Sequence, residues 1–177
     1  MYARHVLPDY LRAGLSVVFV GTSVSTTSAA RGHYYSNPSN KFWSLLGATG
    51  LLDDAVLGPE DDVRINNFRI GLTGIVKVRA ESSDSRLEVK DFDVGGFVAK
   101  MEEHRPLVIA FNGRLAAKVV ARYLDRWVPV AGADWQIADA RVYRLPSSSG
   151  AAAIGSDMKR QAWQAFGAWL RMSMVAR

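Results

Sequence analysis

The distribution of apolar residues along the chain predicts an α/β fold. Short apolar runs rich in β-branched residues predict buried strands at 15–20, 107–111, 135–137 and 142–145. Apolar residues at helical spacing predict helices that begin near residues 39–40, 91, 115 and 156. The last helix is expected to bury Met158, Ala162, Ala165, Phe166 and Trp169. This order favours a three-layer α/β/α arrangement around a central, mostly parallel sheet, with residues 1–177 forming a single domain.

Polar loops directly follow three of the predicted strands. A loop rich in serine, threonine and glycine follows Val20, Asn112-Gly113 follows Phe111, and a serine-rich loop at 146–150 follows Leu145. The carboxyl ends of parallel strands meet at one edge of a sheet, so we expect one pocket there, with backbone N–H groups near an anion or a polar ring. Segment 68–79 is expected to pass close to this pocket, whereas 80–86 is polar and expected to be exposed.

Composition narrows the function classes. The chain contains no cysteine, which excludes disulfides, thiolate metal sites and a cysteine nucleophile. The acidic residues of 53–62 have no accompanying histidine, so we interpret them as a solvated face rather than a metal site. No apolar run approaches the roughly 20 residues of a membrane span, and the N-terminus lacks the apolar region of a signal peptide. We therefore expect a cytoplasmic protein, nucleoid-associated if bacterial. The net charge of +5 permits a polyanionic partner.

Four segments, in this order, resemble the mismatch-specific uracil/thymine-DNA glycosylases of the uracil-DNA glycosylase superfamily. The first contains GTSVS at 21–25, GHYY at 32–35 and PSNKFW at 38–43. At these places the family has GINPG, a Gly-aromatic segment and P-x-N-x-F-W. The later segments are IGLT at 70–73, FNG at 111–113 and LPSSS at 145–149. The similarity runs from about residue 15 to residue 150 and so covers most of the chain.

The resemblance implies a DNA repair enzyme that needs neither a metal nor an organic cofactor. It would flip uracil out of DNA, hydrolyse the N-glycosidic bond, release free uracil and leave an abasic site. We expect a monofunctional glycosylase and a monomer. By position, Tyr35 would stack on the base, while Ser28 and the loop Ser147, Ser148, Ser149 and Gly150 would hold the DNA backbone. The remaining candidates are Tyr34, His33 and Asn112 for the base, and Ser25 and Ala151 for DNA.

Three of these assignments have an alternative that the sequence leaves open. Tyr35 is a core aromatic if its neighbour Tyr34 is the one that points outward. His33 either polarises a uracil oxygen or contacts phosphate, or it is a structural surface residue. Asn112 either reads a base edge or caps the turn from strand to helix.

The first motif departs from the family at the catalytic position. Ser23 stands where the family has the asparagine that positions the attacking water, and Val24 replaces the proline after it. If cleavage of the bond runs ahead of water attack, water positioning is secondary, and hydroxyls such as those of Thr22 and Ser23 suffice. Otherwise the chain is a catalytically weak protein that binds uracil or abasic sites. A small-molecule α/β enzyme with the same loops and no affinity for DNA is the third alternative.

The last loop departs as well. The family pushes a bulky or basic side chain into the gap left by the flipped base, whereas residues 151–153 are alanines, which fill that gap poorly. We therefore expect single-stranded or mispaired uracil to be handled at least as well as uracil in a stacked duplex. Candidate phosphate contacts are Arg31, Lys41, Lys77 and Arg144.

Overall fold

A five-stranded sheet forms the centre of the computed structural model, which describes residues 5–127, 135–150 and 155–175. The strand order is β2-β1-β3-β5-β4. The strands are β1 (Val17–Gly21), β2 (Ile70–Gly74), β3 (Val108–Asn112), β4 (Gln136–Ile137) and β5 (Ala140–Leu145). β2, β1, β3 and β5 are parallel to one another, and the short β4 pairs antiparallel with β5 at the edge.

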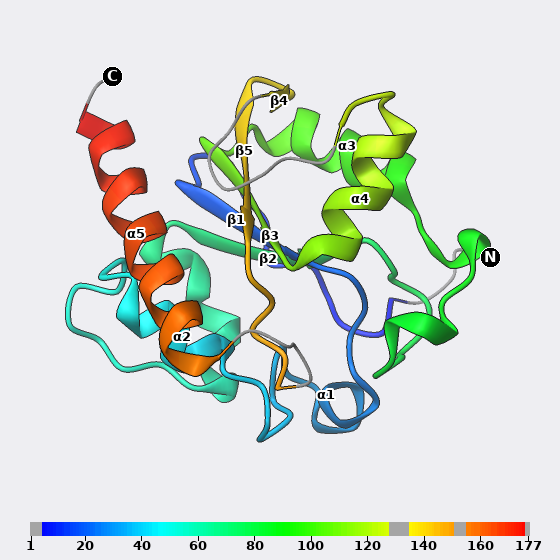
Figure 1. Cartoon of the computed structure of the whole chain (residues 1–177), viewed down its shortest axis with the longest axis horizontal. Coiled ribbons are helices and arrows are strands. Elements are labelled where there is room, and N and C mark those ends of the chain that lie inside the picture. Colours follow the sequence, from blue (N-terminus) through cyan, green and yellow to red (C-terminus); the bar gives the residue numbers. More distant parts are fainter. Residues whose placement is uncertain (1–4, 128–134, 151–154, 176–177) are drawn as a thin grey trace.

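Helices cover both faces of this sheet (Figure 1). α2 (Phe42–Ala48) and α5 (Ser156–Val175) lie on one face, and α3 (Val94–His104) and α4 (Arg114–Tyr123) on the other. The short α1 (Thr26–Arg31) and the 3-10 helices η1 (Pro59–Phe68), η2 (Asp84–Arg86) and η3 (Val89–Asp91) lie in the connections. The predicted three-layer fold with a mostly parallel sheet is confirmed.

The side chains of β1 alternate between the two faces of the sheet and so contribute to a hydrophobic core on each face. Val17 and Phe19 point to the face covered by α2 and α5, whereas Val18 and Val20 point to the face covered by α3 and α4. On the first face, Phe19 stacks on Trp163 of α5 with ring centroids 5.5 Å apart. Gly167 is required where α5 crosses the end of α2, because a Cβ there would collide with the Thr49 backbone.

The buried face of α5 differs from the prediction. Phe166 is fully buried as expected, and Trp169 packs against the same core. The other fully buried apolar side chains of the helix are Trp163 and Leu170, which were not predicted, whereas Met158 is 65% exposed and Ala165 is also exposed. Apolar residues occur on both sides of this helix, so the 3.6-residue period alone does not select the face that packs.

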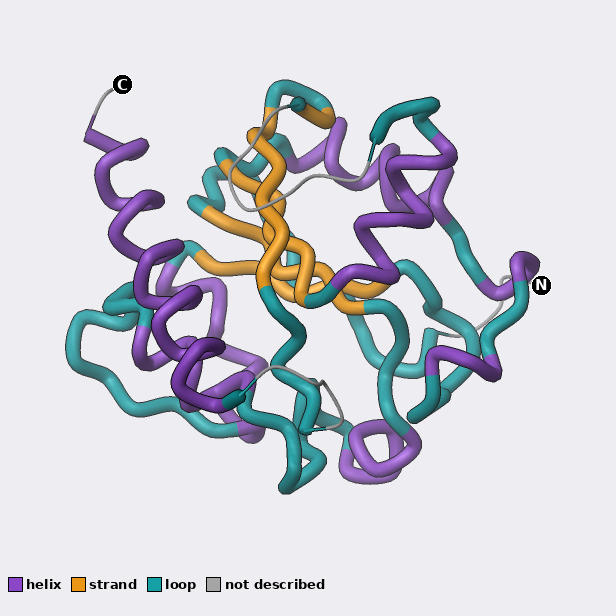
Figure 2. Tube along the Cα trace, viewed as in Figure 1, coloured by secondary structure: helices purple, strands orange, loops and turns teal. Residues whose placement is uncertain are grey.

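Two further elements were not predicted. Segment 68–79 contains β2, and α1 lies inside the stretch that reads as one long polar loop. α1 is only six residues long and mostly polar, so hydrophobic periodicity gives no signal for it. Loops therefore make up most of the end of the molecule at which α1 lies (Figure 2).

Candidate functional site

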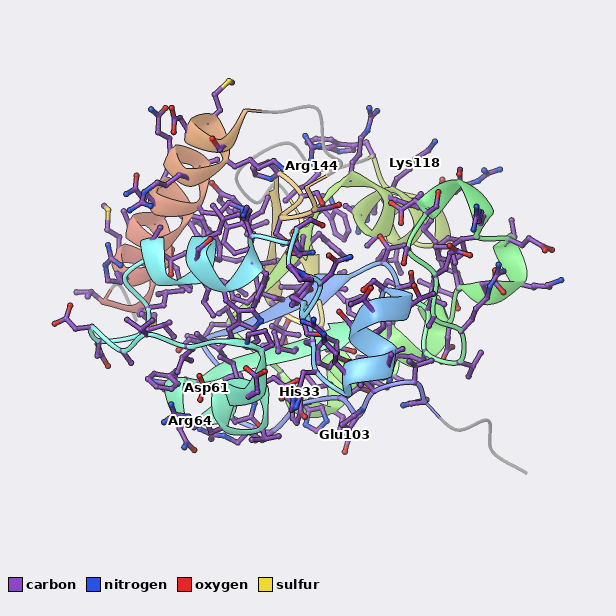
Figure 3. The ribbon with its side chains drawn as sticks, turned by 90° about the horizontal axis from the view of Figure 1, so that it is seen from below. His33, Asp61, Arg64, Glu103, Lys118 and Arg144 are labelled. Carbon is purple, nitrogen blue, oxygen red and sulfur yellow. The ribbon has the colours of Figure 1, made fainter. Side chains whose placement is uncertain are left out.

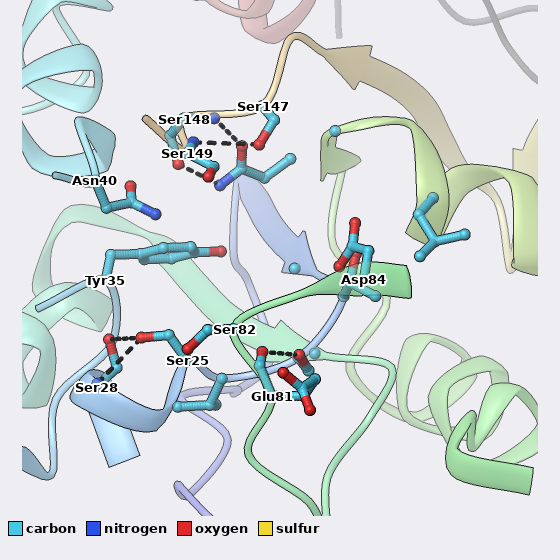
Figure 4. Close-up of a pocket in the computed structure, with 18 of the residues that line it drawn as sticks. Ser25, Ser28, Tyr35, Asn40, Glu81, Ser82, Asp84, Ser147, Ser148 and Ser149 are labelled. Carbon is cyan, nitrogen blue, oxygen red and sulfur yellow. Dashed lines mark hydrogen bonds between the residues drawn. The ribbon is translucent and has the colours of Figure 1, made fainter. Parts of the chain in front are cut away.

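A cavity of about 380 Å³ lies at the carboxyl ends of the parallel strands. Its wall contains 21–25 after β1, the end of β2, 112–115 after β3 and 147–149 after β5. The three polar loops predicted to meet do so here. Ser28, Tyr34, Tyr35, Asn40 and the loop Glu81, Ser82, Ser83 and Asp84 complete the wall (Figure 4).

Tyr35 is held in an unusual backbone conformation at the cavity. Its φ of +55° is left-handed, which is uncommon for an aromatic residue and is maintained only when the surroundings impose it. The neighbouring Ser36 N–H donates to Ser28 Oγ at 3.0 Å, and Trp43 Nε1 donates to the Tyr34 carbonyl at 3.0 Å. The Tyr35 ring stacks on Phe42 at 3.9 Å between centroids, and its hydroxyl points into the cavity.

Glycine at position 21 gives the Tyr35 hydroxyl its space. A Cβ at Gly21 would lie 3.1 Å from that oxygen. Burial raises the pKa of Tyr35 to about 12, although hydrogen bonding with Asn112 acts in the opposite direction. The hydroxyl is therefore neutral at physiological pH and able to donate a hydrogen bond.

Tyr34 and His33 are both held by one buried carboxylate, that of Asp62. Asp62 Oδ2 accepts the Tyr34 N–H at 2.8 Å, and Oδ1 lies 3.0 Å from His33 Nδ1. Tyr34 is buried and donates its hydroxyl to the Pro8 carbonyl at 3.0 Å, so it contributes to the wall rather than facing a ligand. His33 lies outside the set of lining residues. Asp62 itself is fully buried, contrary to the solvated face predicted for this acidic segment.

The serines of the first loop mostly bond to one another and to the backbone. Ser23 Oγ donates to the Glu81 carbonyl at 2.7 Å. Ser25 caps α1 by accepting the Ser28 N–H at 3.1 Å, and its hydroxyl donates to Ser28 Oγ at 3.0 Å. Ser28 is 2% exposed, so the predicted contact of its side chain with the DNA backbone is not available in this structure. Thr22 lines the cavity, and its carbonyl accepts the Val76 N–H.

Asn112 fastens the serine-rich loop to the end of β3. Its Nδ2 donates to Ser148 Oγ, and its Oδ1 accepts the Ser148 N–H, both at 2.8 Å. Of the predicted DNA-binding loop, Ser147, Ser148 and Ser149 line the cavity, with Ser148 itself fully buried. Gly150 packs against Ser39 outside the lining, and Ala151 falls outside the described residues.

The loop at 81–84 is the part of the site that sequence reasoning missed. Ser82, Asp84 and Arg86 are exposed as predicted for this segment, but the loop also folds back over the first loop. Glu81 N–H donates to the Val24 carbonyl, and Thr26 N–H donates to Ser82 Oγ at 3.1 Å. The Glu81 carboxylate accepts the Ser83 N–H at 3.0 Å, which together with Arg86 and Arg79 holds the pKa of Glu81 below its usual value. The hydropathy pattern does not predict that this loop folds back, because the groups that hold it are polar.

Two of the candidate phosphate contacts, Lys77 and Arg31, bond to other groups of the protein. Lys77 is buried, with Nζ 2.7 Å from Asp9 Oδ1, so a phosphate cannot reach it. Arg31 donates to the Ser36 carbonyl at 2.7 Å. Within the described ranges, no cluster of histidine, aspartate or glutamate has the grouping of a metal site, and no helix there is long and apolar enough to span a membrane.

Comparison with known proteins identifies the family. Residues 8–167 match the family described as the uracil DNA glycosylase superfamily. The chain belongs to the uracil DNA glycosylase superfamily. It is also similar to the solution NMR structure of a Methanosarcina acetivorans protein provisionally named a uracil DNA glycosylase, with a TM-score of 0.65 and 28% sequence identity. That match covers 97% of this chain and 99% of the other.

Membership of the superfamily supports a uracil-DNA glycosylase-like function in DNA repair. In open α/β sheets, ligands bind beyond the carboxyl ends of the strands. The cavity of this superfamily member lies there, which makes it the candidate active site.

Proposed function

We propose that the protein is a monofunctional glycosylase of the mismatch-specific type, which flips uracil out of DNA and hydrolyses its N-glycosidic bond. The observation that supports this most directly is the Tyr35 ring, which stacks on Phe42 and lines the cavity formed by the loops after β1, β3 and β5. The cavity volume of about 380 Å³ falls within the range of small-ligand sites, roughly 300–1,000 Å³. A flipped base would stack on the Tyr35 ring, while hydroxyls and backbone groups surround its polar edge.

The proposed reaction breaks the bond between the sugar and the base and adds water to the sugar. Negative charge develops on the departing uracil, and backbone N–H groups and hydroxyls aimed at it lower the barrier. The hydroxyl and carboxylate groups of the wall are suited to orienting a water molecule. The products are free uracil and an abasic site, and we propose that the protein acts as a monomer in the cytoplasm.

A second candidate function is recognition of uracil or abasic sites without efficient turnover. The Ser23 hydrogen bond favours it, because that hydroxyl already donates its proton to the Glu81 carbonyl at 2.7 Å. Ser23 can then only accept a hydrogen bond from water, and it has no basicity with which to take a proton.

Single-turnover cleavage of a uracil-containing oligonucleotide, with enzyme in excess, tests the proposed function. We expect wild-type protein to release uracil from single-stranded and G-paired substrates well above background, at least as fast as from a matched A-paired duplex. Ser23→Ala should retain activity to within about tenfold, since its main contact is with the protein backbone. Absence of release from any substrate, with uracil-dependent binding retained, would favour the recognition protein.

A stripe of basic side chains extends from the cavity along α4. Arg114 lines the cavity, and Lys118 and Arg122 follow at four-residue intervals on the exposed face of the helix. Figure 3 shows the position of Lys118 on this helix. Within the described part of the chain, none of the three forms a salt bridge. The strand that flanks a flipped nucleotide could therefore place its phosphates along α4.

Removing this charge should weaken DNA binding in a salt-dependent way. For the double variant Lys118→Ala/Arg122→Ala, we expect the slope of log K against log salt to fall by about 1.4, from about 0.7 per phosphate contact on a single strand. Salt-titrated fluorescence anisotropy with a uracil-containing single strand measures the slope. Arg64→Ala/Lys90→Ala removes the same charge from exposed positions elsewhere and should leave the slope unchanged. Equal slopes for all three proteins would disprove the contact.

A further inference from the structure

One carboxylate that lines the cavity is exposed to solvent and is not held by another side chain of the described residues. Asp84 begins η2 and lines the cavity, and Figure 4 shows its side chain turned toward the cavity, across from the Tyr35 hydroxyl. Among the described residues, its carboxylate takes part in neither a hydrogen bond nor a salt bridge. Glu81, three residues earlier, differs in that Ser83 and Arg79 hold its carboxylate.

Although solvent reaches it, a negative charge on the wall of a cavity that we propose binds DNA opposes that binding, unless it acts on a positive charge or on a proton. It repels phosphates and opposes the charge that develops on the departing uracil. The sugar that loses its base develops the opposite charge, because bond breaking ahead of water attack gives it oxocarbenium character. A nearby carboxylate stabilises that cation and accepts a hydrogen bond from the water that attacks it.

The first motif does not supply these functions. The Ser23 hydroxyl donates to the Glu81 carbonyl, and a serine hydroxyl is not a base at neutral pH. This same contact fastens the 81–84 loop to the 21–25 loop, and so places Asp84 on the wall that contains Ser23. The 81–84 loop can therefore supply the carboxylate that the 21–25 loop lacks.

We propose that Asp84 is the catalytic carboxylate of this site. The bond from C1′ to the base nitrogen breaks ahead of the bond that the water oxygen forms to C1′. The electron pair of the broken bond leaves with uracil, and the water proton passes to Asp84 and from there to solvent or to the uracil anion. This proposal rests on the proposed glycosylase function and deepens it.

The pH dependence of the cleavage rate follows from the titratable side chains that line the cavity. The titratable or charged side chains that line the cavity with Asp84 are Tyr34, Tyr35, Glu81 and Arg114, and Arg79 and Arg86 flank it along the chain. Desolvation raises the pKa of Asp84. The pKa of Glu81 is lowered, and those of both tyrosines are raised. Asp84 is thus the wall carboxylate that protonates first as the pH falls, and the rate should fall with it.

The test compares Asp84→Asn with wild type in single-turnover cleavage of a uracil-containing single strand at saturating protein. We expect a loss of about 100-fold or more, within the 10²- to 10⁴-fold range of acid–base catalysis. Affinity for the same strand should be unchanged or higher, because a negative charge is removed. The acid-side fall in the wild-type rate should disappear in the variant. Asp54→Asn makes the same change on an exposed turn outside the cavity and should match wild type.

Three results would overturn the proposal, and they are distinguishable. If wild type cleaves and Asp84→Asn cleaves within threefold of it, Asp84 is not catalytic and the glycosylase function stands. If the variant loses affinity as much as rate, or melts at a clearly lower temperature, its role is structural. If wild type cleaves none of the substrates, the glycosylase function and the role of Asp84 are both rejected.

Discussion

Replacing Asp9 by alanine is expected to lower the free energy of unfolding by about 3–5 kcal/mol, the range seen when one partner of a buried ion pair is removed. Asp9 Oδ1 lies 2.7 Å from Lys77 Nζ and accepts the Thr73 hydroxyl at 2.6 Å, and Oδ2 lies 2.6 Å from Lys100 Nζ. The Lys77 side chain is 3% exposed, so the variant would leave an ammonium group buried without its counter-charge. Chemical denaturation at neutral pH measures the loss.

Two variants make this prediction specific. Glu88→Gln breaks the exposed pair with Lys90, whose members are 62% and 74% exposed, and should change stability by less than about 1 kcal/mol. Adding Lys77→Met to Asp9→Ala removes the stranded charge and should recover part of the stability. If Asp9→Ala were no more harmful than Glu88→Gln, the buried pair would contribute little to the stability of the fold.

The same pair predicts how stability depends on pH. Burial alone would raise the pKa of Asp9, but the charge of Lys77 and hydrogen bonds from Lys100, Lys77 and Thr73 outweigh it and leave the pKa below the ordinary value of 3.8. A lowered folded-state pKa stabilises the protein above pH 3.8, and that contribution is lost as the pH falls through the folded-state value. The stability gap between wild type and Asp9→Ala should therefore narrow in acid.

Much of the fold follows from local patterns. The strands near residues 17–20, 108–111 and 142–145 were predictable because fully buried parallel strands are short, apolar and β-branched, and polar loops mark where they end. Since those strands are parallel, the loops after Val20, Phe111 and Leu145 had to meet at one edge. The position of the cavity was therefore predictable from the sequence.

Polar long-range contacts were not predictable in the same way. Asp62 lies among acidic residues that read as a solvated surface, yet it is buried because it accepts the Tyr34 N–H from 28 residues away. The sequence predicts that Lys77 is a surface cation, but it is buried against Asp9, which is distant in the sequence and near the N-terminus. A single polar side chain does not reveal whether its partner is water or a distant group. The wrong predictions therefore concern residues around the cavity, because contacts of this kind join the loops that form it.

The two aromatic candidates show where sequence and structure complement each other. The paired tyrosines left open which of them faces the cavity. The Asp62 carboxylate decides it, because holding the Tyr34 backbone and burying its ring leaves Tyr35 as the residue whose hydroxyl points into the cavity. This position of the Tyr35 side chain requires a left-handed φ, a backbone conformation that is unfavourable for residues other than glycine.

Replacing Tyr35 by alanine is therefore expected to weaken binding of uracil-containing DNA by about 5- to 150-fold, since stacking of one base on an aromatic side chain contributes about 1–3 kcal/mol. Tyr35→Phe keeps the ring stacked on Phe42 and removes only the hydroxyl above Gly21, so it should bind within about threefold of wild type. Anisotropy with uracil-containing and uracil-free strands of equal length separates base stacking from phosphate binding. The loss in Tyr35→Ala should be confined to the uracil strand, because the exposed cations of α4 that would contact the backbone are unchanged. An equal loss on both strands would mean that the substitution has disturbed the loop rather than removed a base platform.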